Sequence, residues 1–290
     1  MKKNSRYTVG FLFPMVLIMV SLVLIPIVKT FFYSLQKYKL TEPQNTRYIG
    51  LDNYIEILKG SPFWYSVGNT ALIIVVVILA GLVLSIGVAL ILNRDTRISG
   101  FLTAVAIIPW ALPPVVNGMI WKFIFHPDHG LMNRMLLLTG VVEEPVKWLN
   151  SRVGSLIIVG LIVAWRVIPF CAIVFLANMQ AISKEIFEAA KVDGAGELST
   201  FTQITMPLLL PSVAIVLTNL TMQAINVFDE VIALVGYRSA GQPLLIYNYT
   251  ETFSFLNFGY GSAITYIIML GSGVFGYLYI RSLKGRRDPA

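Results

Sequence analysis

The 290-residue chain is 56% hydrophobic and only 13% charged, and its mean hydropathy is +0.74. Because soluble domains carry roughly one-quarter charged residues, this composition excludes an ordinary soluble protein. The net charge of +7 does not indicate nucleic-acid binding, since the basic residues are scattered between apolar runs instead of forming one basic face. The single cysteine, Cys171, excludes a disulfide framework or a cysteine metal cluster within the chain.

The first apolar run covers about residues 10–35 and follows the basic residues Lys2, Lys3 and Arg6. Cleavable signal peptides also begin with basic residues, but their hydrophobic part is roughly 7–15 residues long and ends at small residues. This run continues past Pro26 without such a cleavage site. We therefore expect an uncleaved first membrane span.

Five further runs are long enough to cross a hydrocarbon core about 30 Å thick. They cover about residues 69–92, 101–125, 154–181, 207–229 and 262–280. The run at 101–125 contains Pro109, Pro113 and Pro114, and we expect a kink there because proline lacks a backbone donor. Long uninterrupted runs exclude an outer-membrane barrel, whose strands alternate over roughly ten residues. The sequence predicts an all-α integral membrane protein with six transmembrane helices.

Six spans place both chain termini on one side of the membrane. The loops on that side hold eleven lysines and arginines, whereas the opposite loops hold eight. Basic residues accumulate in cytoplasmic loops, so we expect the termini and the segment 182–206 to lie in the cytoplasm. The predicted location is the cell (cytoplasmic) membrane.

The segment from Ile182 to Pro207 has the features of two short helices. Ser183 is a suitable N-cap, Glu185 lies where the helix dipole favours an anion, and Gly194 suits a left-handed residue after the helix. We expect a second helix to run from there to Pro207.

One face of the first of these helices is small and mostly apolar. It consists of Ile186, Ala189, Ala190 and Asp193, at positions i, i+3, i+4 and i+7. Such a face fits a partner protein, or it fits the chain's own spans. Periodicity leaves both alternatives open.

The same segment carries a recognisable motif. Glu188-Ala189-Ala190 is followed after three residues by Gly194, and after nine more by Ile204 and then Met206-Pro207. This order resembles the EAA signature of permease subunits of binding-protein-dependent ABC importers. Met206 replaces the usual leucine of that family, a substitution that preserves bulk and hydrophobicity.

Several other blocks resemble carbohydrate-uptake permeases of the maltose-transporter type. They are residues 48–54, 63–64, 69–70, 109–113, 121–122 and 165–170. One departure is Gly241-Gln242-Pro243, where the subfamily often has Gly-Gly-Pro. The resemblance extends over most of the chain.

The resemblance implies a type I ABC importer (MetI-like) transmembrane domain. We expect an N-terminal helix and outward loop at 1–65, the permease domain at 66–281 and a cytoplasmic tail at 282–290. The implied partners are a second permease subunit in a heterodimer, two cytoplasmic ATP-binding subunits, an extracytoplasmic solute-binding protein, a sugar substrate and membrane lipid, with no nucleic acid.

The resemblance also gives the EAA segment a role, as a helix that docks into a cleft on an ATPase subunit. Glu188 would contact a basic or polar group there, Ala189 and Ala190 would permit close approach, and Gly194 would supply the turn. The full coupling set is Glu188, Ala189, Ala190, Asp193, Gly194, Ala195, Ile204 and Pro207.

The chain lacks the phosphate-binding pattern G-x-x-x-x-G-K-[ST], so we expect ATP hydrolysis on a separate subunit. We predict a transport subunit with no catalytic residues, no cofactor and no metal site. The two histidines, His126 and His129, belong to no metal-binding array.

A sugar path needs hydrogen-bonding groups between spans, because each sugar hydroxyl loses water on binding. Span five offers Asn219, Gln223, Asn226 and Glu230 at i, i+4, i+7 and i+11, which a continuous helix would place on one face. Such side chains also hold helices together, so both substrate contact and helix packing remain open. Arg166 in span four must face a cavity, a carboxylate or a carbonyl, with a structural contact or a substrate contact as alternatives.

Two other functions compete with sugar import. A polyol phosphate permease would have similar motifs, and Arg166 suits an anion. An ion-coupled secondary transporter would place carboxylates at mid-membrane, whereas here they lie in loops and at span ends, as at Asp229 and Glu230.

Overall fold

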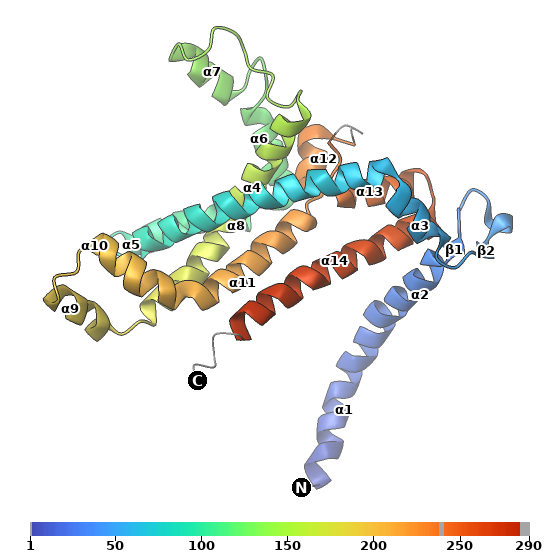
Figure 1. The fold of residues 1–290 in the computed structure, drawn as a ribbon, viewed down its shortest axis with the longest axis horizontal. Helices are drawn as coiled ribbons and strands as arrows, with labels where there is room; N and C mark the ends of the chain where they lie inside the picture. Colours follow the sequence, from blue (N-terminus) through green and yellow to red (C-terminus); the bar gives the residue numbers. More distant parts are fainter. Residues whose placement is uncertain (1, 95, 238–240, 285–290) are drawn as a thin grey trace. The chain divides into compact units, whose positions relative to one another are not determined.

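The computed structural model describes residues 2–94, 96–237 and 241–284, which are mainly helical (Figure 1). The chain forms two compact units, one from Met1–Trp64 with Tyr247–Leu270 and the other from Tyr65–Ile246 with Gly271–Ala290. Most of the tail predicted at 282–290 lies outside the described residues, which end at 284.

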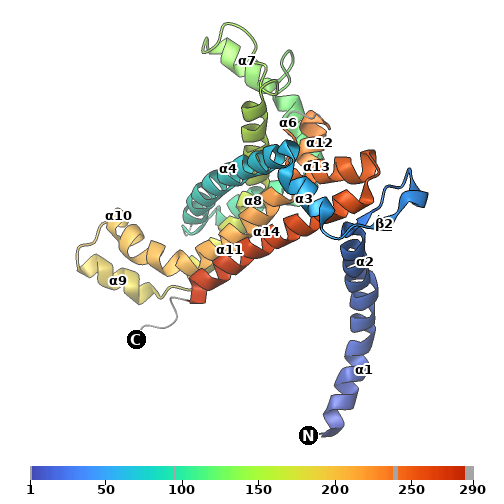
Figure 2. The same cartoon turned by 45° about the vertical axis from the view of Figure 1, so that its right-hand side comes forward.

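The first unit contains the N-terminal span and a short hairpin at its end (Figure 2). Its elements are α1 (Lys2–Met19), a π-helical turn (Val20–Leu24), α2 (Ile25–Ser34), β1 (Gln36–Lys37), a 3₁₀ turn (Pro43–Asn45), β2 (Arg47–Tyr48), α3 (Asp52–Lys59), a second π-helical turn (Thr250–Ser254) and the first part of α14 (Phe258–Lys284). The strands pair antiparallel, Gln36 with Tyr48. Asn53 Nδ2 donates to the carbonyls of Ser34 (2.8 Å) and Gln36 (2.9 Å), which fixes the chain where α2 ends.

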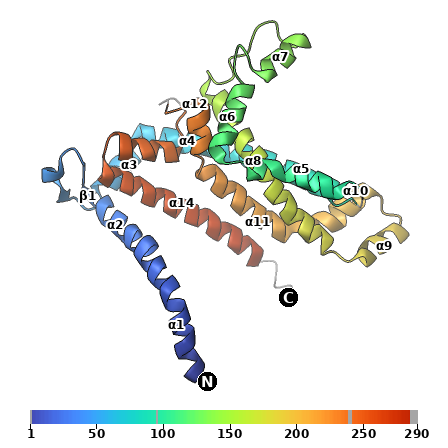
Figure 3. The same ribbon diagram turned by 180° about the vertical axis from the view of Figure 1, so that it is seen from behind.

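The second unit contains the long spans and the EAA segment (Figure 3). Its elements are α4 (Ser61–Leu92, which begins in the first unit), α5 (Ser99–Ala111), α6 (Pro114–Ile124), α7 (Leu131–Leu138), α8 (Arg152–Gln180), α9 (Lys184–Val192), α10 (Glu197–Thr200), a π-helical turn (Phe201–Thr205), α11 (Met206–Ile225), α12 (Asp229–Val235) and α13 (Leu244–Tyr249, which continues into the first unit).

Helix α8 is the centre of this second unit, and it packs against both α5 and α11. Fifteen of its residues are buried, so it faces protein on most sides and not lipid. Two glycines allow close helix contacts. A Cβ on Gly160 would lie 2.7 Å from Val76 Cγ1 of α4, and a Cβ on Gly81 would lie 2.5 Å from Leu220 Cδ2 of α11.

The contacts of α4 and α8 favour the broken helix pair α5–α6 as one further span. Arg152 Nε donates to Asn69 Oδ1 (2.8 Å) near the beginning of both helices, and Leu90 and Met179 near their ends line one cavity. These contacts show that α4 and α8 run in the same direction. The chain between them must therefore return from the end of α4 to the side where both helices begin. Five helices of the described chain are long and apolar enough to span alone, and α5–α6 completes the predicted six.

The predicted kink in span three is confirmed, and it is a sharp break. α5 and α6 meet at 97° between Ala111 and Pro114. Leu112 and Pro113 are extended there, because the residue before a proline is pushed out of the helical region.

Two other predicted span boundaries were wrong. α4 begins at Ser61 and not near residue 69, since Pro62 is in the first turn, where its missing donor is harmless. Pro207 does not end a helix, because residues 197–225 form one continuous helical segment. The π-helical turn immediately before Met206 widens the backbone ahead of this proline, the kind of local adjustment that accommodates a missing donor.

Candidate functional site

Helix α9 has the ends that the sequence predicts. Ser183 Oγ accepts from the Glu185 N–H at 3.3 Å. At the other end, the Gly194 N–H donates to Lys191 O (3.1 Å) and the Ala195 N–H donates to Ala190 O (2.9 Å). With Gly194 at φ +76°, these two bonds form a Schellman motif.

The predicted small-residue face of α9 divides between two environments. Ala190 is 6% exposed and packs against its own chain, whereas Glu188, Ala189 and Asp193 are exposed. The resemblance implies that Ala190 lies at the surface that meets an ATPase subunit. In the structure this residue is covered by its own chain. Packing against its own chain thus accounts for Ala190, and contact of the exposed side with a partner stays a prediction.

The rest of the predicted coupling set lies on the return to span five. Ala195 and Ile204 are half-buried, and Gly194 and Pro207 are exposed. Only the exposed part of this set is available for a partner subunit.

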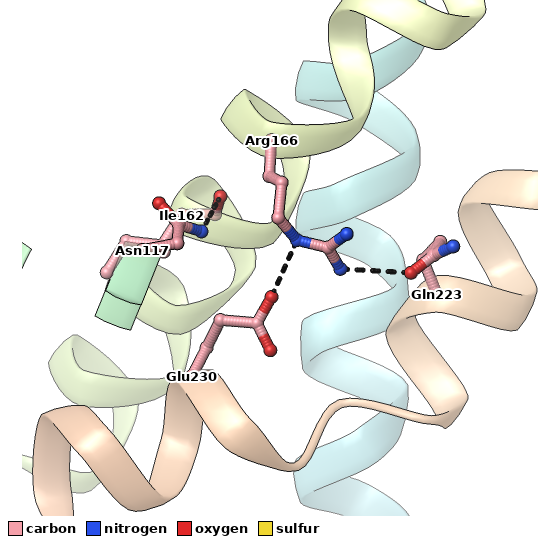
Figure 4. Close-up of polar contacts among 5 residues, drawn as sticks. All are labelled: Asn117, Ile162, Arg166, Gln223 and Glu230. Carbon is pink, nitrogen blue, oxygen red and sulfur yellow. Dashed lines mark hydrogen bonds and ion pairs between the residues drawn. The ribbon is translucent and has the colours of Figure 1, made fainter. Parts of the chain in front are cut away.

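Arg166 of α8 makes an ion pair inside the second unit. Its Nε lies 2.8 Å from Glu230 Oε1, and its Nη2 donates to Gln223 Oε1 at 3.0 Å (Figure 4). The Arg166 side chain is 12% exposed and that of Glu230 is 3% exposed. Of the expected alternatives, a cavity, a carboxylate or a carbonyl, the structure shows a carboxylate beside this arginine. The contacts of Arg166 join α8 to α12 through Glu230 and to α11 through Gln223.

The predicted polar face of span five is only partly correct. Asn219 and Gln223 lie one turn apart on α11, but this helix ends at Ile225 and Glu230 belongs to the separate helix α12. Asn226 is the C-cap of α11, is exposed, and donates to its own helix at Met222 O (2.8 Å). A short amide side chain that bonds nearby backbone favours such a helix end. Glu230 thus reaches Arg166 from a second helix and not from the same face.

Sequence analysis missed the contribution of α6 to this site. A Cβ on Gly118 would lie 2.7 Å from Ala233 Cβ and 3.0 Å from Glu230 Cα, so glycine allows α12 to pack directly on α6. The neighbouring Asn117 is fully buried and its Nδ2 donates to Ile162 O at 3.4 Å. An asparagine next to a glycine inside an apolar run is the signal that would have identified it.

Several buried polar atoms of α6 and α11 have no hydrogen-bond partner among the described residues. They are Asn117 Oδ1, Trp121 Nε1, Asn219 Oδ1 and Ser212 Oγ. Buried polar groups nearly always have a partner, which here must be water, a ligand or another subunit. The two asparagine oxygens accept, Trp121 Nε1 donates, and the Ser212 hydroxyl can do either, so groups of both kinds are available to hydroxyl groups of a ligand. The described residues contain no group of three metal-ligating side chains.

Two aromatic contacts join the broken span to α8. Trp110 stacks on Phe170 with ring centroids 6.0 Å apart, and Trp121 meets Trp165 edge-on at 5.5 Å. These residues belong to the blocks that resemble carbohydrate permeases, so those blocks meet in space beside Arg166.

The chain matches a family described as the inner membrane component of binding-protein-dependent transport systems, over residues 81–287. The chain belongs to this family. It is therefore a permease subunit of a binding-protein-dependent ABC importer, as its resemblance to the EAA signature predicts.

Two curated relatives are similar over nearly the whole chain. The trehalose/maltose transport system permease protein MalF of Thermococcus litoralis is 32% identical, covering 95% of this chain and 92% of that protein. The sulfoquinovosyl glycerol transport system permease protein SmoG of Agrobacterium fabrum is 31% identical, covering 92% and 87%.

A solved structure with the same fold is a bacterial ABC transporter involved in the import of the acidic polysaccharide alginate. Its chain superimposes with a TM-score of 0.83 at 20% identity, covering 99% of this chain and 98% of that one. The predicted type I importer fold is confirmed.

Proposed function

We propose that this subunit forms half of the translocation path for a sugar, either a mono- or an oligosaccharide. The observation that carries the proposal is the buried polar group around Arg166, Gln223, Asn219 and Asn117, which has unused hydrogen-bonding atoms. The names of the two relatives, which refer to trehalose/maltose and sulfoquinovosyl glycerol, support a carbohydrate substrate.

The ion pair favours an uncharged substrate over a polyol phosphate. The charge of Arg166 is already balanced by Glu230, and its Nη2 is occupied by Gln223. An anion that took the place of Glu230 would leave this nearly fully buried carboxylate without a partner, at a cost of several kcal/mol. Membership of the ABC importer family also disfavours an ion-coupled secondary transporter.

We further propose the usual assembly of such a subunit: a heterodimer with a second permease, two cytoplasmic ATPase subunits and an extracytoplasmic solute-binding protein. Both termini and α9 would lie in the cytoplasm. The exposed side of α9, with Glu188, Ala189 and Asp193, would dock on an ATPase subunit, and the Schellman turn at Gly194 would pass its motion to α11.

The substitution Gln223→Leu tests the substrate role. It removes the side-chain amide that would bond a sugar hydroxyl, and a hydrogen bond between neutral groups contributes about 0.5–1.5 kcal/mol, so we expect uptake to fall roughly two- to tenfold. The measurement is uptake of radiolabelled trehalose and maltose by the assembled transporter, together with copurification of its subunits.

Asn226→Leu is the matched control, because among the described residues the Asn226 side chain bonds only to its own helix. It should keep uptake near that of the parent protein. If Gln223→Leu instead prevents assembly, Gln223 holds helices together and the substrate role is wrong.

A further inference from the structure

A cavity of about 600 Å³ lies where α4, α8, α9 and α10 meet, away from the cluster around Arg166. Its size is within the range of small-molecule sites. Much of its wall is apolar, from Leu90, Met179, Leu198 and Phe201. Neither the sugar path nor the exposed side of α9 includes these residues.

The charges at this cavity are unbalanced. Arg94, Lys191 and Glu197 are the charged residues among those that line it, so the cations outnumber the carboxylate. Within the described part of the chain, neither Arg94 nor Lys191 has a carboxylate within ion-pair distance. Two cations beside an apolar wall favour an anion that carries a hydrocarbon chain.

The cavity lies at the level of the membrane surface. It is formed where α4 and α8 end and where the helical segment 197–225 begins, and these are three ends of membrane spans. The loops on this side are the more basic ones, so we expect the cavity to lie at the cytoplasmic leaflet. Basic pockets between span ends on that side bind the head groups of anionic lipids.

We propose that the cavity binds an anionic phospholipid of the cytoplasmic leaflet. Its phosphate would lie between Arg94 and Lys191, and an acyl chain would pack along Leu90, Met179 and Phe201. Since Lys191 belongs to α9 and Arg94 follows α4, one lipid would bridge the coupling helix to the membrane domain. The site does not depend on which substrate the transporter carries.

Fluorescence quenching tests this site directly. Phe201→Trp places an indole in the cavity wall, and the complete transporter is reconstituted in phosphatidylcholine nanodiscs that contain brominated phosphatidylglycerol or, in a parallel sample, brominated phosphatidylcholine. The parent protein gives the background of its five native tryptophans. We expect stronger quenching by the brominated phosphatidylglycerol at equal mole fraction.

Two variants and one competitor decide between the outcomes. Arg94→Gln and Lys191→Gln should each raise the phosphatidylglycerol fraction for half-maximal quenching roughly fivefold, the contribution expected of one basic residue near a membrane surface. Lys184→Gln on the same helix is the control and should change nothing, because Lys184 does not line the cavity. Equal quenching by the two lipids would overturn the proposal. So would relief of quenching by millimolar inorganic phosphate, which would indicate a site for free anions.

Discussion

At the scale of single residues, Arg166 and Glu230 depend on each other. Arg166 Nε and Glu230 Oε1 lie 2.8 Å apart, and both side chains are mostly buried. The two residues are 64 positions apart in the sequence and belong to different helices. Removal of either partner leaves a buried charge without compensation, whereas removal of both leaves no charge at all. The pair therefore stabilises one packing of α8 against α12.

A double-mutant cycle on this pair measures that dependence. Arg166→Met and Glu230→Met should each lower stability by about 3–5 kcal/mol, and the double variant should be more stable than either single one. Thermal unfolding of the detergent-purified transporter gives the three differences. Simple addition of the two single effects would mean that the charges are not coupled.

At the scale of elements, the sequence predicted the type of almost every long helix and the break between α5 and α6, but not the break between α11 and α12. Hydrophobic length identified the spans, and Ser183 and Gly194 identified the ends of α9, because caps are local chemistry. The end of α11 was missed since Asn226 and Glu230 fit a continuous helix equally well. The contact of Glu230 with the distant Arg166 distinguishes a continuous helix from a helix that breaks after Ile225. A single sequence does not reveal which distant residues are in contact.

The turn after α9 provides a test at this scale. Gly194→Ala forces a side chain into a left-handed conformation at a cost of about 1–2 kcal/mol. We expect slower uptake and faster hydrogen exchange of the Ala195 amide, which bonds to Ala190 O. Gly196→Ala is the control, since Gly196 has φ −73° and, as at Gly194, an added Cβ meets nothing within 4 Å. Equal effects of the two variants would contradict a role for backbone conformation.

At the scale of the whole molecule, the six-span topology was predictable, and the orientation and domain boundaries stay predictions. The common direction of α4 and α8 favours one further crossing of the chain between them. The excess of basic residues near the termini favours a cytoplasmic location for them, but no contact inside the chain can report on the membrane sides.

Cysteine labelling tests this orientation. Cys171 is the only cysteine and is fully buried, so Asp193→Cys introduces a single reactive thiol on the exposed side of α9. A membrane-impermeant maleimide should label it in inverted vesicles and not in whole cells. Coexpressed ATPase subunits should protect it, whereas a cysteine at Tyr48, in the predicted outward loop, should be labelled in cells and not be protected. Labelling of both from the same side would contradict the proposed topology.

The close contact at Gly118 brings two interrupted spans together. The α5–α6 break and the α11–α12 break each release backbone N–H and C=O groups from helical bonding, and acyl chains cannot satisfy them. These groups must therefore be buried in protein or face water, and not lipid. The two helix breaks are thus the part of the subunit that is least able to face lipid acyl chains.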